Sequence, residues 1–491
     1  MNCIIKRFEE LTLDELYQIL QLRSAVFVVE QNCPYQDVDG LDQNSVHLWL
    51  EEDGRMLAYL RWFPDPEGSG RLHIGRMLSA EHGKGWGGIA IHEALKRIDQ
   101  ESPAEIEIEA QVYARGFYER EGFVGCSEEF DLDGIPHLRM IRPLKGEKMK
   151  RFEGFQHGID LGGWLSQCDH TQETYENFIK EEDFALIASW GLDHVRIPLD
   201  YELFEDEQGN YREEGFALLK RAVGWAENNG LNTVLDLHKT CGFSFDAGEK
   251  EEGFFTSETY QERFYRLWEK LAHTFADHRG HIAFELLNEV TRKEDGEAWN
   301  RISKECVVRL RRIVPDIPIL LGGYYNNGID ALKDLWIPEE KDNIVYNFHC
   351  YEPLVFTHQG AYWIPSMDTS FRTSADLTYG DIRRLTKEQL GDHFVEETDF
   401  PDDEVLSSAY FDVLFKEAVR VAEERDVALY CGEYGVVDRA DPKDILAWYK
   451  MISPVFEKYG IGRAAWNFRG KDFGFVDEHM QPVLKEVVPL L

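Results

Sequence analysis

From about residue 150 onward, short apolar runs alternate with longer segments in which apolar residues recur every three or four positions. The short runs have the length of buried strands, and the longer segments are typical of amphipathic helices. Strands that alternate with helices form a parallel sheet with crossover helices. Eight runs fit strands, at 158–161, 194–197, 233–237, 282–287, 317–321, 344–348, 427–431 and 462–466. An α/β fold, a (β/α)8 TIM barrel over 149–491, is therefore predicted.

The connection after the sixth predicted strand, from about 352 to 426, is too long for an ordinary barrel loop. Its last part, 407–424, has the periodicity of a crossover helix. About 364–404 is therefore expected to be an inserted subdomain with a helical segment at 383–391. It either roofs the active face or is a surface elaboration.

The first 145 residues follow a different pattern, which predicts an α+β domain. Helices are expected at 11–29, 89–98 and 116–121, and strands at 48–62, 71–77 and 104–111. Thr12 and Glu15 suit a capping box at the first helix. The segment 143–150 is short and charged and contains Pro143 and Gly146, as linkers do. The sequence thus predicts two domains, 1–145 and 149–491.

Composition narrows the functional classes. The 491 residues include 91 Asp or Glu and only 53 Lys or Arg, a net charge of −38. This charge disfavours nucleic acids and anionic membrane surfaces as partners and fits a neutral substrate. No segment approaches the ~18 apolar residues of a membrane span, and the charged start does not fit a signal peptide, so a cytoplasmic protein is expected. The eight cysteines include no C-x-x-C pair that would indicate zinc.

Polar residues follow most of the predicted barrel strands. Among them, Glu289 and Glu433 each come after an apolar run that reads as a strand. In a parallel barrel the carboxyl ends of the strands meet at one face, where active sites lie. A glycosidase needs two carboxyls, one to protonate the leaving oxygen and one to attack or to activate water. Either glutamate alone would equally suit a helix cap or a turn, but together they predict a carbohydrate-cleaving enzyme.

Resemblance to glycoside hydrolase family 5, in particular its clostridial endoglucanase C type, is carried by GIDLGGWLSQ, HVRIPLDY, HIAFELLNEV, IVYNFHCYEPLVFTHQGAYW and LYCGEYGV. It covers about 150–491 and includes the eight active-site positions of the family: Arg196, His238, Asn288, Glu289, His349, Tyr351, Glu433 and Trp466. The resemblance implies retaining hydrolysis of β-1,4-linked and mixed-linkage glucans, with no metal and no cofactor.

The same resemblance implies a role for each position. Glu289 is the expected general acid/base and Glu433 the expected nucleophile. Tyr351 and Arg196 are expected to keep the nucleophile ionised, and Asn288 is expected to bind the sugar 2-hydroxyl. His349 is expected to orient Glu289. His238 is expected to contact the sugar at the cleavage point, and Trp466 to form its apolar floor. Trp164 and Trp363 are candidates for stacking on neighbouring sugars, with core packing as the alternative. Asp160, Tyr201 and Asn326 are weaker candidates for residues of the site.

Residues 1–143 resemble the GNAT acetyltransferases, particularly their ElaA-like branch, through LQLRSAVFVVEQNCPYQDVDG, HIGRM, GFYEREGF and DLDGIPHLRM. The resemblance implies acetyl-CoA as co-substrate, with its pyrophosphate received by N–H groups at a helix start. The candidate cofactor-binding loop comprises His82, Gly83, Lys84, Gly85, Trp86, Gly87 and Gly88. Tyr118 occupies the position of the residue that protonates the departing thiolate.

Two features depart from the GNAT pattern. His82 stands where Arg or Gln is usual, and the stretch from Arg76 to the loop is about two residues short. The acceptor is open: a polar cluster either lines its site or is ordinary surface charge, and comprises Arg23, Glu30, Gln31, Asp37 and His47.

The leading hypothesis is an acetyltransferase domain fused to an endo-acting retaining β-glucanase. One alternative is an exo-acting β-glucosidase or β-1,3-glucanase on short oligosaccharides. Another is a barrel that only binds glucan while acetyl transfer is the main activity. The expected partner is a β-glucan or oligosaccharide, with neither nucleic acid nor membrane, and the oligomeric state is open.

Overall fold

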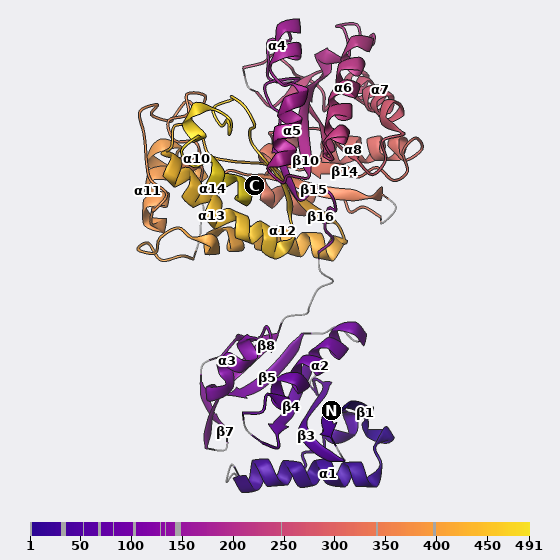
Figure 1. Ribbon diagram of the computed structural model, residues 1–491, viewed down its shortest axis with the longest axis vertical. Coiled ribbons are helices and arrows are strands. Elements are labelled where there is room, and N and C mark those ends of the chain that lie inside the picture. Colours follow the sequence, from indigo (N-terminus) through magenta and orange to yellow (C-terminus); the bar gives the residue numbers. More distant parts are fainter. Residues whose placement is uncertain are drawn as a thin grey trace. The chain divides into compact units, whose positions relative to one another are not determined.

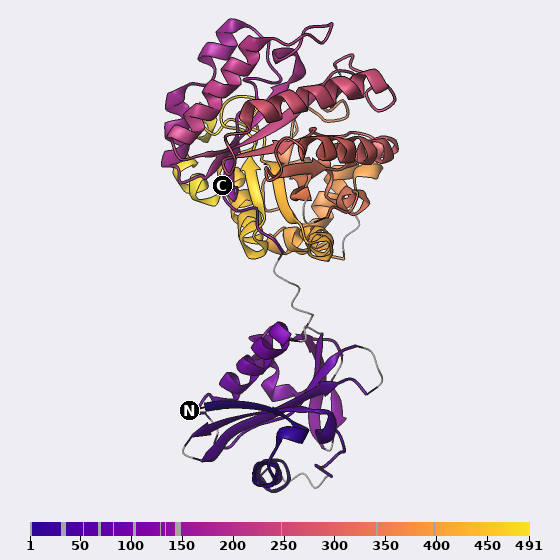
Figure 2. The same ribbon diagram turned by 90° about the vertical axis from the view of Figure 1, so that its right-hand side faces the viewer.

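The computed structural model describes the chain except residues 1, 31–35, 53, 67–69, 82, 102–104, 128, 133, 143–148, 247, 340, 341 and 396–398. The chain divides into two compact units, Met1–Lys148 and Met149–Leu491 (Figures 1 and 2). In the described residues, no helix combines the length and the apolar character that a bilayer crossing requires.

In the second unit, parallel strands close into a barrel because the last strand pairs with the first. All eight predicted strands are present, so the predicted barrel is confirmed. The strands are β9 (His157–Asp160), β10 (His194–Asp200), β11 (Asn232–Thr240), β13 (Ile282–Glu285), β14 (Ile319–Gly322), β15 (Ile344–Cys350), β16 (Ala428–Tyr434) and β17 (Gly462–Ala465). A short strand, β12 (Phe243–Ser244), pairs antiparallel with β11.

Helices surround the barrel (Figure 1). They are α4 (Gln172–Asn177), α5 (Glu181–Ser189), α6 (Glu213–Asn228), α7 (Glu258–Phe275), α8 (Gly296–Leu310), α9 (Tyr324–Asn327), α10 (Leu354–Thr357), α11 (Tyr379–Gln389), α12 (Ser408–Arg425), α13 (Pro442–Tyr459) and α14 (Leu484–Val487). Their ends follow from local chemistry. In α13, Asp441 caps the first turn, Pro442 needs no N–H partner there, and Gly460 ends the helix with a φ of 69°.

The amino-terminal end of the barrel is filled by aromatic residues. Phe152 and Phe155 stack with ring centroids 4.2 Å apart, and Phe152 meets the edge of Tyr430. The Tyr430 hydroxyl lies 2.7 Å from His194 Nε2. This packed floor leaves the carboxyl ends of the strands as the face on which a site can form.

The expected insertion lies between α10 and α12. Its helix α11 begins four residues before the predicted segment, with Thr378 as its cap. A small apolar cluster of Val355, Met367 and Leu390 packs this segment onto α10.

The first unit contains a sheet in the order β1-β2-β3-β4-β5-β8-β6, with β7 beside β8. The strands are β1 (Asn2–Arg7), β2 (Val46–Glu52), β3 (Arg55–Pro64), β4 (Leu72–Ser79), β5 (Ile106–Gln111), β6 (Val124–Gly125), β7 (Phe130–Leu132) and β8 (Ile135–Arg142). The helices are α1 (Leu13–Arg23), α2 (Trp86–Glu101) and α3 (Arg115–Glu119). An α+β fold was expected here, and the capping box of Thr12 and Glu15 is present.

Three details of this unit differ from the prediction. The apolar run at 48–62 is two antiparallel strands, β2 and β3, that reverse at Gly54, whose φ is 77°. The helix predicted at 11–29 is α-helical only to Arg23 and continues as a π-helix, Ser24–Glu30. Helix α2 begins at Trp86 rather than at 89, so Gly87 belongs to the helix and not to the loop.

Candidate active site

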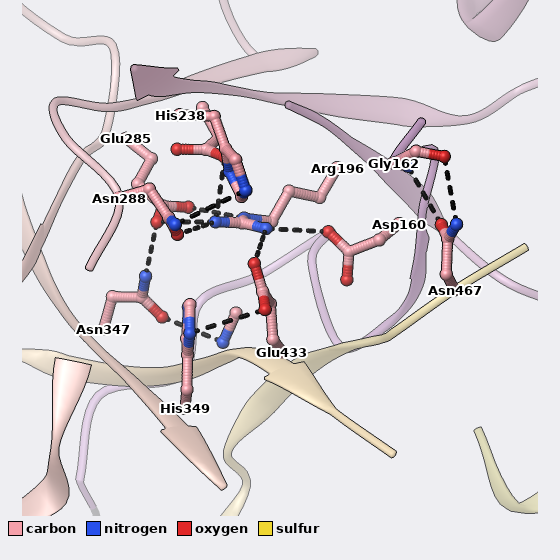
Figure 3. A network of polar contacts seen from close by, with 12 residues as sticks. Asp160, Gly162, Arg196, His238, Glu285, Asn288, Asn347, His349, Glu433 and Asn467 are labelled. Atoms are coloured by element: carbon pink, nitrogen blue, oxygen red, sulfur yellow. Dashed lines mark hydrogen bonds and ion pairs between the residues drawn. The ribbon is translucent and has the colours of Figure 1, made fainter. Parts of the chain in front are cut away.

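Inward-facing polar side chains gather at the carboxyl ends of the barrel strands (Figure 3). Side chains two residues apart on a strand share a face. Asp236 therefore accompanies His238 on β11, and Asn347 accompanies His349 on β15; all four are buried. Asn347 also accepts a hydrogen bond from the Gly432 N–H at 2.9 Å.

Glu289 and Glu433 lie on either side of His349. One carboxylate oxygen of each glutamate and one ring nitrogen of His349 all lie within 4.8 Å of one another. Glu433 belongs to β16, whereas Glu289 follows the end of β13 at Glu285 on a loop. The φ of Glu289 is 40°, a left-handed conformation that is uncommon outside glycine and often marks functional sites. The sequence had placed Glu289 at the end of the strand itself.

Arg196, fully buried on β10, is the hub of the polar network. Its Nη1 lies 2.8 Å from Glu433 Oε1 and 2.9 Å from Asp160 Oδ1. Its Nε and Nη2 bind the two oxygens of Glu285, at 2.7 and 2.9 Å, and Nη2 also lies 3.0 Å from Asp236 Oδ2. A guanidinium this close favours the ionised form of a carboxyl.

Glu433 receives a second donor on its other oxygen. The Tyr351 hydroxyl donates to Glu433 Oε2 at 2.9 Å, and His349 Nδ1 lies 3.6 Å from the same oxygen. Each oxygen of this buried carboxylate thus has a hydrogen-bond donor, which supports its negative charge.

Glu289 has different surroundings, in which none of the described Lys or Arg side chains is in contact. Asn326 Nδ2 donates to Glu289 Oε2 at 2.9 Å. Burial raises the pKa of Glu289, and the hydrogen bond from Asn326 offsets part of this rise. The surroundings of the two glutamates therefore differ: two donors contact Glu433, whereas burial disfavours the charged form of Glu289.

The protonation of His349 follows from its neighbours. Asn327 Nδ2 lies 3.2 Å from His349 Nε2, and because an amide N–H only donates, Nε2 is the acceptor. The ring proton then sits on Nδ1, 2.8 Å from Glu289 Oε1, to which it is donated. Burial lowers the pKa of His349 to about 4, so the ring is neutral near pH 7.

His238 forms a second oriented imidazole. Its Nδ1 lies 2.6 Å from Asp236 Oδ2, and its ring is parallel to Trp466, with centroids 5.9 Å apart. Burial lowers the pKa of His238, and burial raises that of Asp236 to about 7. Asn467 fixes Trp466 beside β9 by exchanging hydrogen bonds of 2.9 and 3.0 Å with the Gly162 backbone.

Two groups of described residues have the donor types of a metal site: Glu289, His349 and Glu433; and His170, Asp200 and Glu202. In the first, Arg196 and Tyr351 already bind Glu433. In the second, Lys239 lies 2.5 Å from Glu202 and supplies the positive charge. Each group thus already contacts a cationic side chain.

In the first unit, β4 and β5 pair with each other at Leu72–Ile106 and His73–Glu107. Beyond these two positions, the described residues of the two strands do not pair with each other. Tyr118 on α3 reaches across to β4, where its hydroxyl donates to Met77 Sδ at 3.4 Å. Burial raises the pKa of Tyr118, which keeps the phenol protonated. Gly83, Lys84 and Gly85 directly precede α2, whereas His82 lies outside the described residues.

The expected acceptor cluster is mostly structural. The Arg23 side chain is fully buried and donates to Asp37 and Asp42, at 2.9 and 2.7 Å. His47 is also fully buried, and its nitrogens are occupied by the Tyr59 hydroxyl and the Asp42 carbonyl. These two side chains bind neighbouring segments of the unit and are too buried to contact an acceptor. Glu30 is exposed, and Gln31 lies outside the described residues.

Comparison with known proteins identifies both units. The family model described as Cellulase (glycosyl hydrolase family 5) matches residues 152–472, about two thirds of the chain. The chain belongs to glycoside hydrolase family 5. A second model, described as Acetyltransferase (GNAT) domain, matches residues 17–144, so a GNAT domain precedes the family 5 domain.

Relatives agree with this division. Cellodextrinase A of Ruminococcus flavefaciens is 46% identical over 315 residues, which cover 64% of this chain and 86% of that protein. Endoglucanase C of Acetivibrio thermocellus is 37% identical over 341 residues, 69% of this chain and 98% of that protein. Protein ElaA of Escherichia coli is 36% identical over 140 residues, 28% of this chain and 92% of that protein. Both resemblances seen in the sequence are confirmed.

The two tryptophans proposed for sugar stacking differ within the family 5 domain. Trp164 is fully buried, stacks on Trp225 with centroids 6.3 Å apart, and donates to the Tyr175 carbonyl. A ring with no open face cannot stack on a sugar, so this expectation was wrong. Trp363 is 40% exposed and packs against Phe473 and His358, both of which contact Tyr351. It thus lies close to the catalytic pair.

Of the weaker candidates, only Asn326 reaches the catalytic pair directly. Asp160 lies behind Arg196, and the Tyr201 hydroxyl is bound to Glu251 at 2.8 Å. The sequence missed Asp236, Glu285, Asn347 and Asn327. Asp236 and Asn347 had a signal, because each stands two residues before a predicted site histidine on the same strand face. No comparable signal marked Glu285 or Asn327.

Proposed function

We propose that the family 5 domain is a retaining β-glucanase in which Glu289 is the general acid/base and Glu433 the nucleophile. The carboxyl pair carries this proposal, because oxygens of the two groups lie within 4.8 Å of each other. Retaining glycosidases hold their carboxyls ~5–5.5 Å apart, whereas inverting enzymes need ~6.5–9.5 Å to admit a water molecule.

The surroundings assign the two roles. Glu433 accepts from Arg196 Nη1 and from the Tyr351 hydroxyl, donors that favour a carboxylate ready to attack. Burial raises the pKa of Glu289, as a group that must carry a proton near neutral pH requires. Neutral His349, which donates to Glu289 Oε1, orients this carboxyl toward the glycosidic oxygen.

In the first step Glu433 attacks the anomeric carbon while Glu289 gives its proton to the departing oxygen. The glycosidic bond breaks, and the sugar is held as an ester on Glu433. In the second step Glu289, now a carboxylate, takes a proton from water, whose oxygen attacks the same carbon and releases Glu433. Two inversions leave the anomeric configuration unchanged.

The neighbouring side chains would bind the sugar at the cleavage point. Asn288 Oδ1 accepts from Arg196 Nη2 at 3.0 Å, and Asn288 Nδ2 lies 3.5 Å from His238 Nε2, which leaves its second N–H for the sugar 2-hydroxyl. His238 donates from Nδ1 to Asp236, so its Nε2 can accept from a hydroxyl. Trp466 offers the apolar face that a pyranose ring needs, and exposed Trp363 would stack on a further sugar.

The substrate class follows from the relatives. Proteins named cellodextrinase and endoglucanase align over nearly all of the family 5 domain. We therefore propose internal cleavage of β-1,4-linked and mixed-linkage glucans, with short cello-oligosaccharides also accepted.

The test compares product release by the full chain and by Glu433→Gln. The panel is barley mixed-linkage glucan, carboxymethylcellulose, laminarin, mannan and cello-oligosaccharides. Several oligomer sizes from the 1,4-linked glucans, absent with Glu433→Gln, are expected; glucose alone would indicate an exo-acting enzyme. Glu417→Gln, which alters an exposed glutamate paired with Arg420, is the matched control. Hydrolysis that survives Glu433→Gln would contradict the assignment.

For the first unit we propose acetyl-CoA-dependent N-acyl transfer. The diverging strands β4 and β5 offer the cleft, and N–H groups at the start of α2 would receive the pyrophosphate. Acetyl-CoA would supply the acyl group, and Tyr118, held protonated by burial, would give its proton to the departing thiolate. CoA release with a panel of amines tests this proposal, and no release with any amine would favour a silent domain.

A further inference from the structure

Four buried carboxyl groups share one guanidinium at the base of the catalytic site. Arg196 lies within hydrogen-bond distance of Asp160, Asp236, Glu285 and Glu433. The nearby imidazoles add no charge, because burial lowers the pKa of both His238 and His349. Four anions against one cation would be very costly away from water, so at least one of the carboxyls holds a proton.

The donors that reach each carboxyl indicate which carboxyl holds the proton. Glu285 accepts from Arg196 Nε and Nη2 and from Asn347 Nδ2 at 2.8 Å, so both of its oxygens are bound. Glu433 has a donor on each oxygen. Asp236 has His238 Nδ1 and Arg196 Nη2 within 3.0 Å of its Oδ2, and among the described residues its Oδ1 has no partner.

Asp160 has the least support for a charge. Its side chain is fully buried, and it accepts one hydrogen bond, from Arg196 Nη1 to Oδ1 at 2.9 Å. Among the described residues nothing donates to its Oδ2, the oxygen drawn without a dashed line in Figure 3. A charged oxygen without a donor is more costly in the interior than a neutral one.

We propose that Asp160 is a neutral carboxylic acid in the resting enzyme and acts as a positioning residue for Arg196. It accepts one N–H of Nη1 and so holds this nitrogen beside Glu433, but it does not compete for the positive charge. That charge is left to Glu285 and to the nucleophile. The inference rests on the proposed role of Glu433.

The electrostatics of the surrounding strands agree with this assignment. Burial raises the pKa of Asp160 well above its usual range; Arg196 opposes the rise, and Glu433 and Glu285 add to it. The other titratable groups that interact with Asp160 are Tyr351, Tyr430, Cys431 and Tyr434. On the β17 side, Arg463 is paired with Glu457 and the Leu491 carbonyl.

The test is Asp160→Asn, a neutral side chain of the same shape. The infrared spectrum of the resting protein is expected to lose one carbonyl band of a protonated carboxylic acid. Asp160→Asn keeps the Oδ1 acceptor for Arg196 Nη1, whereas Asp160→Ala removes it, so kcat/KM on glucan is expected to fall further in Asp160→Ala than in Asp160→Asn. Glu285→Gln, the contrast variant, removes an ionised partner of Arg196 and is expected to lower activity far more.

Three results would overturn the proposal: no lost band, equal losses of kcat/KM in Asp160→Asn and Asp160→Ala, or an unfolded Asp160→Asn protein. The infrared band of wild-type protein labelled with 13C-aspartate is a second measurement that needs no variant. At a pH above 7, where Asp236 is ionised, the labelled band is expected to persist. Neither spectrum requires turnover, so failure here is distinct from failure of the hydrolase assignment.

Discussion

Replacing Tyr351 by Phe tests what the hydrogen bond from its hydroxyl to Glu433 contributes to the proposed reaction. The Tyr351 hydroxyl donates to Glu433 Oε2 at 2.9 Å, and Arg196 serves the other oxygen at 2.8 Å. The substitution removes one oxygen and keeps the ring, whose packing against Phe473 and His358 is preserved. The change therefore acts on one carboxylate hydrogen bond and leaves the apolar contacts in place.

The size of the effect follows from that bond. A hydrogen bond to a charged group contributes about 1.5–3 kcal/mol. A factor of ten in rate corresponds to about 1.36 kcal/mol. Loss of this bond should therefore lower kcat/KM by about 10- to 150-fold.

The assay is kcat/KM on an aryl β-cellobioside, whose good leaving group reduces the demand on Glu289. The control is Tyr430→Phe, which removes another buried hydroxyl from the floor of the barrel, where it lies beside His194. The kcat/KM of this control is expected to stay near that of wild type, because Tyr430 does not contact Glu433. An unchanged kcat/KM in Tyr351→Phe, or equal losses in both variants, would refute the reasoning.

Four further predictions follow. Glu289→Ala should slow glucan hydrolysis on the order of 10²–10⁴-fold but slow aryl glycosides much less, because their leaving group needs no proton; equal losses in steady-state rates would refute the acid role. Trp164→Ala should lower the free energy of unfolding by about 3–5 kcal/mol in urea titrations, while the KM of the folded fraction stays unchanged. A raised KM without lost stability would indicate that Trp164 contacts a sugar. Asp236, whose pKa is raised from 3.8 to about 7, should contribute stability that is present below pH 4 and lost as pH rises through 7; denaturation against pH should show this loss in wild type and not in Asp236→Asn. Tyr118→Phe should slow CoA release from acetyl-CoA on the order of 10²-fold or more, and an unchanged rate would remove Tyr118 from the transfer step.

The predictions that were wrong rested on the spacing of residues along the sequence, which was ambiguous by itself. The run at 48–62 has the apolar character of one long strand, but the chain reverses at Gly54 to form β2 and β3. Trp164 stands close in sequence to the site, yet its ring turns into the core against Trp225. Periodicity reports which positions are apolar, but the direction of a side chain outside regular structure depends on what packs against it.

The sequence by itself determined the architecture and pointed to the two glutamates that are proposed to react. Eight apolar runs predicted eight strands, and the order of a parallel barrel brings Glu289 and Glu433 to one face, because all strands point the same way. Capping residues such as Thr12 act over three or four positions and are therefore readable locally.

Only the tertiary structure decided how charge is divided within that face. Arg196 contacts four carboxyls on four other strands, and one of them, Glu433, lies 237 positions away in the sequence. Which oxygen receives a donor, which histidine nitrogen carries the proton, and which carboxyl stays neutral all depend on distances of a few ångströms between distant segments. Burial then amplifies each of these differences, because the low effective dielectric of the interior screens the charges only weakly.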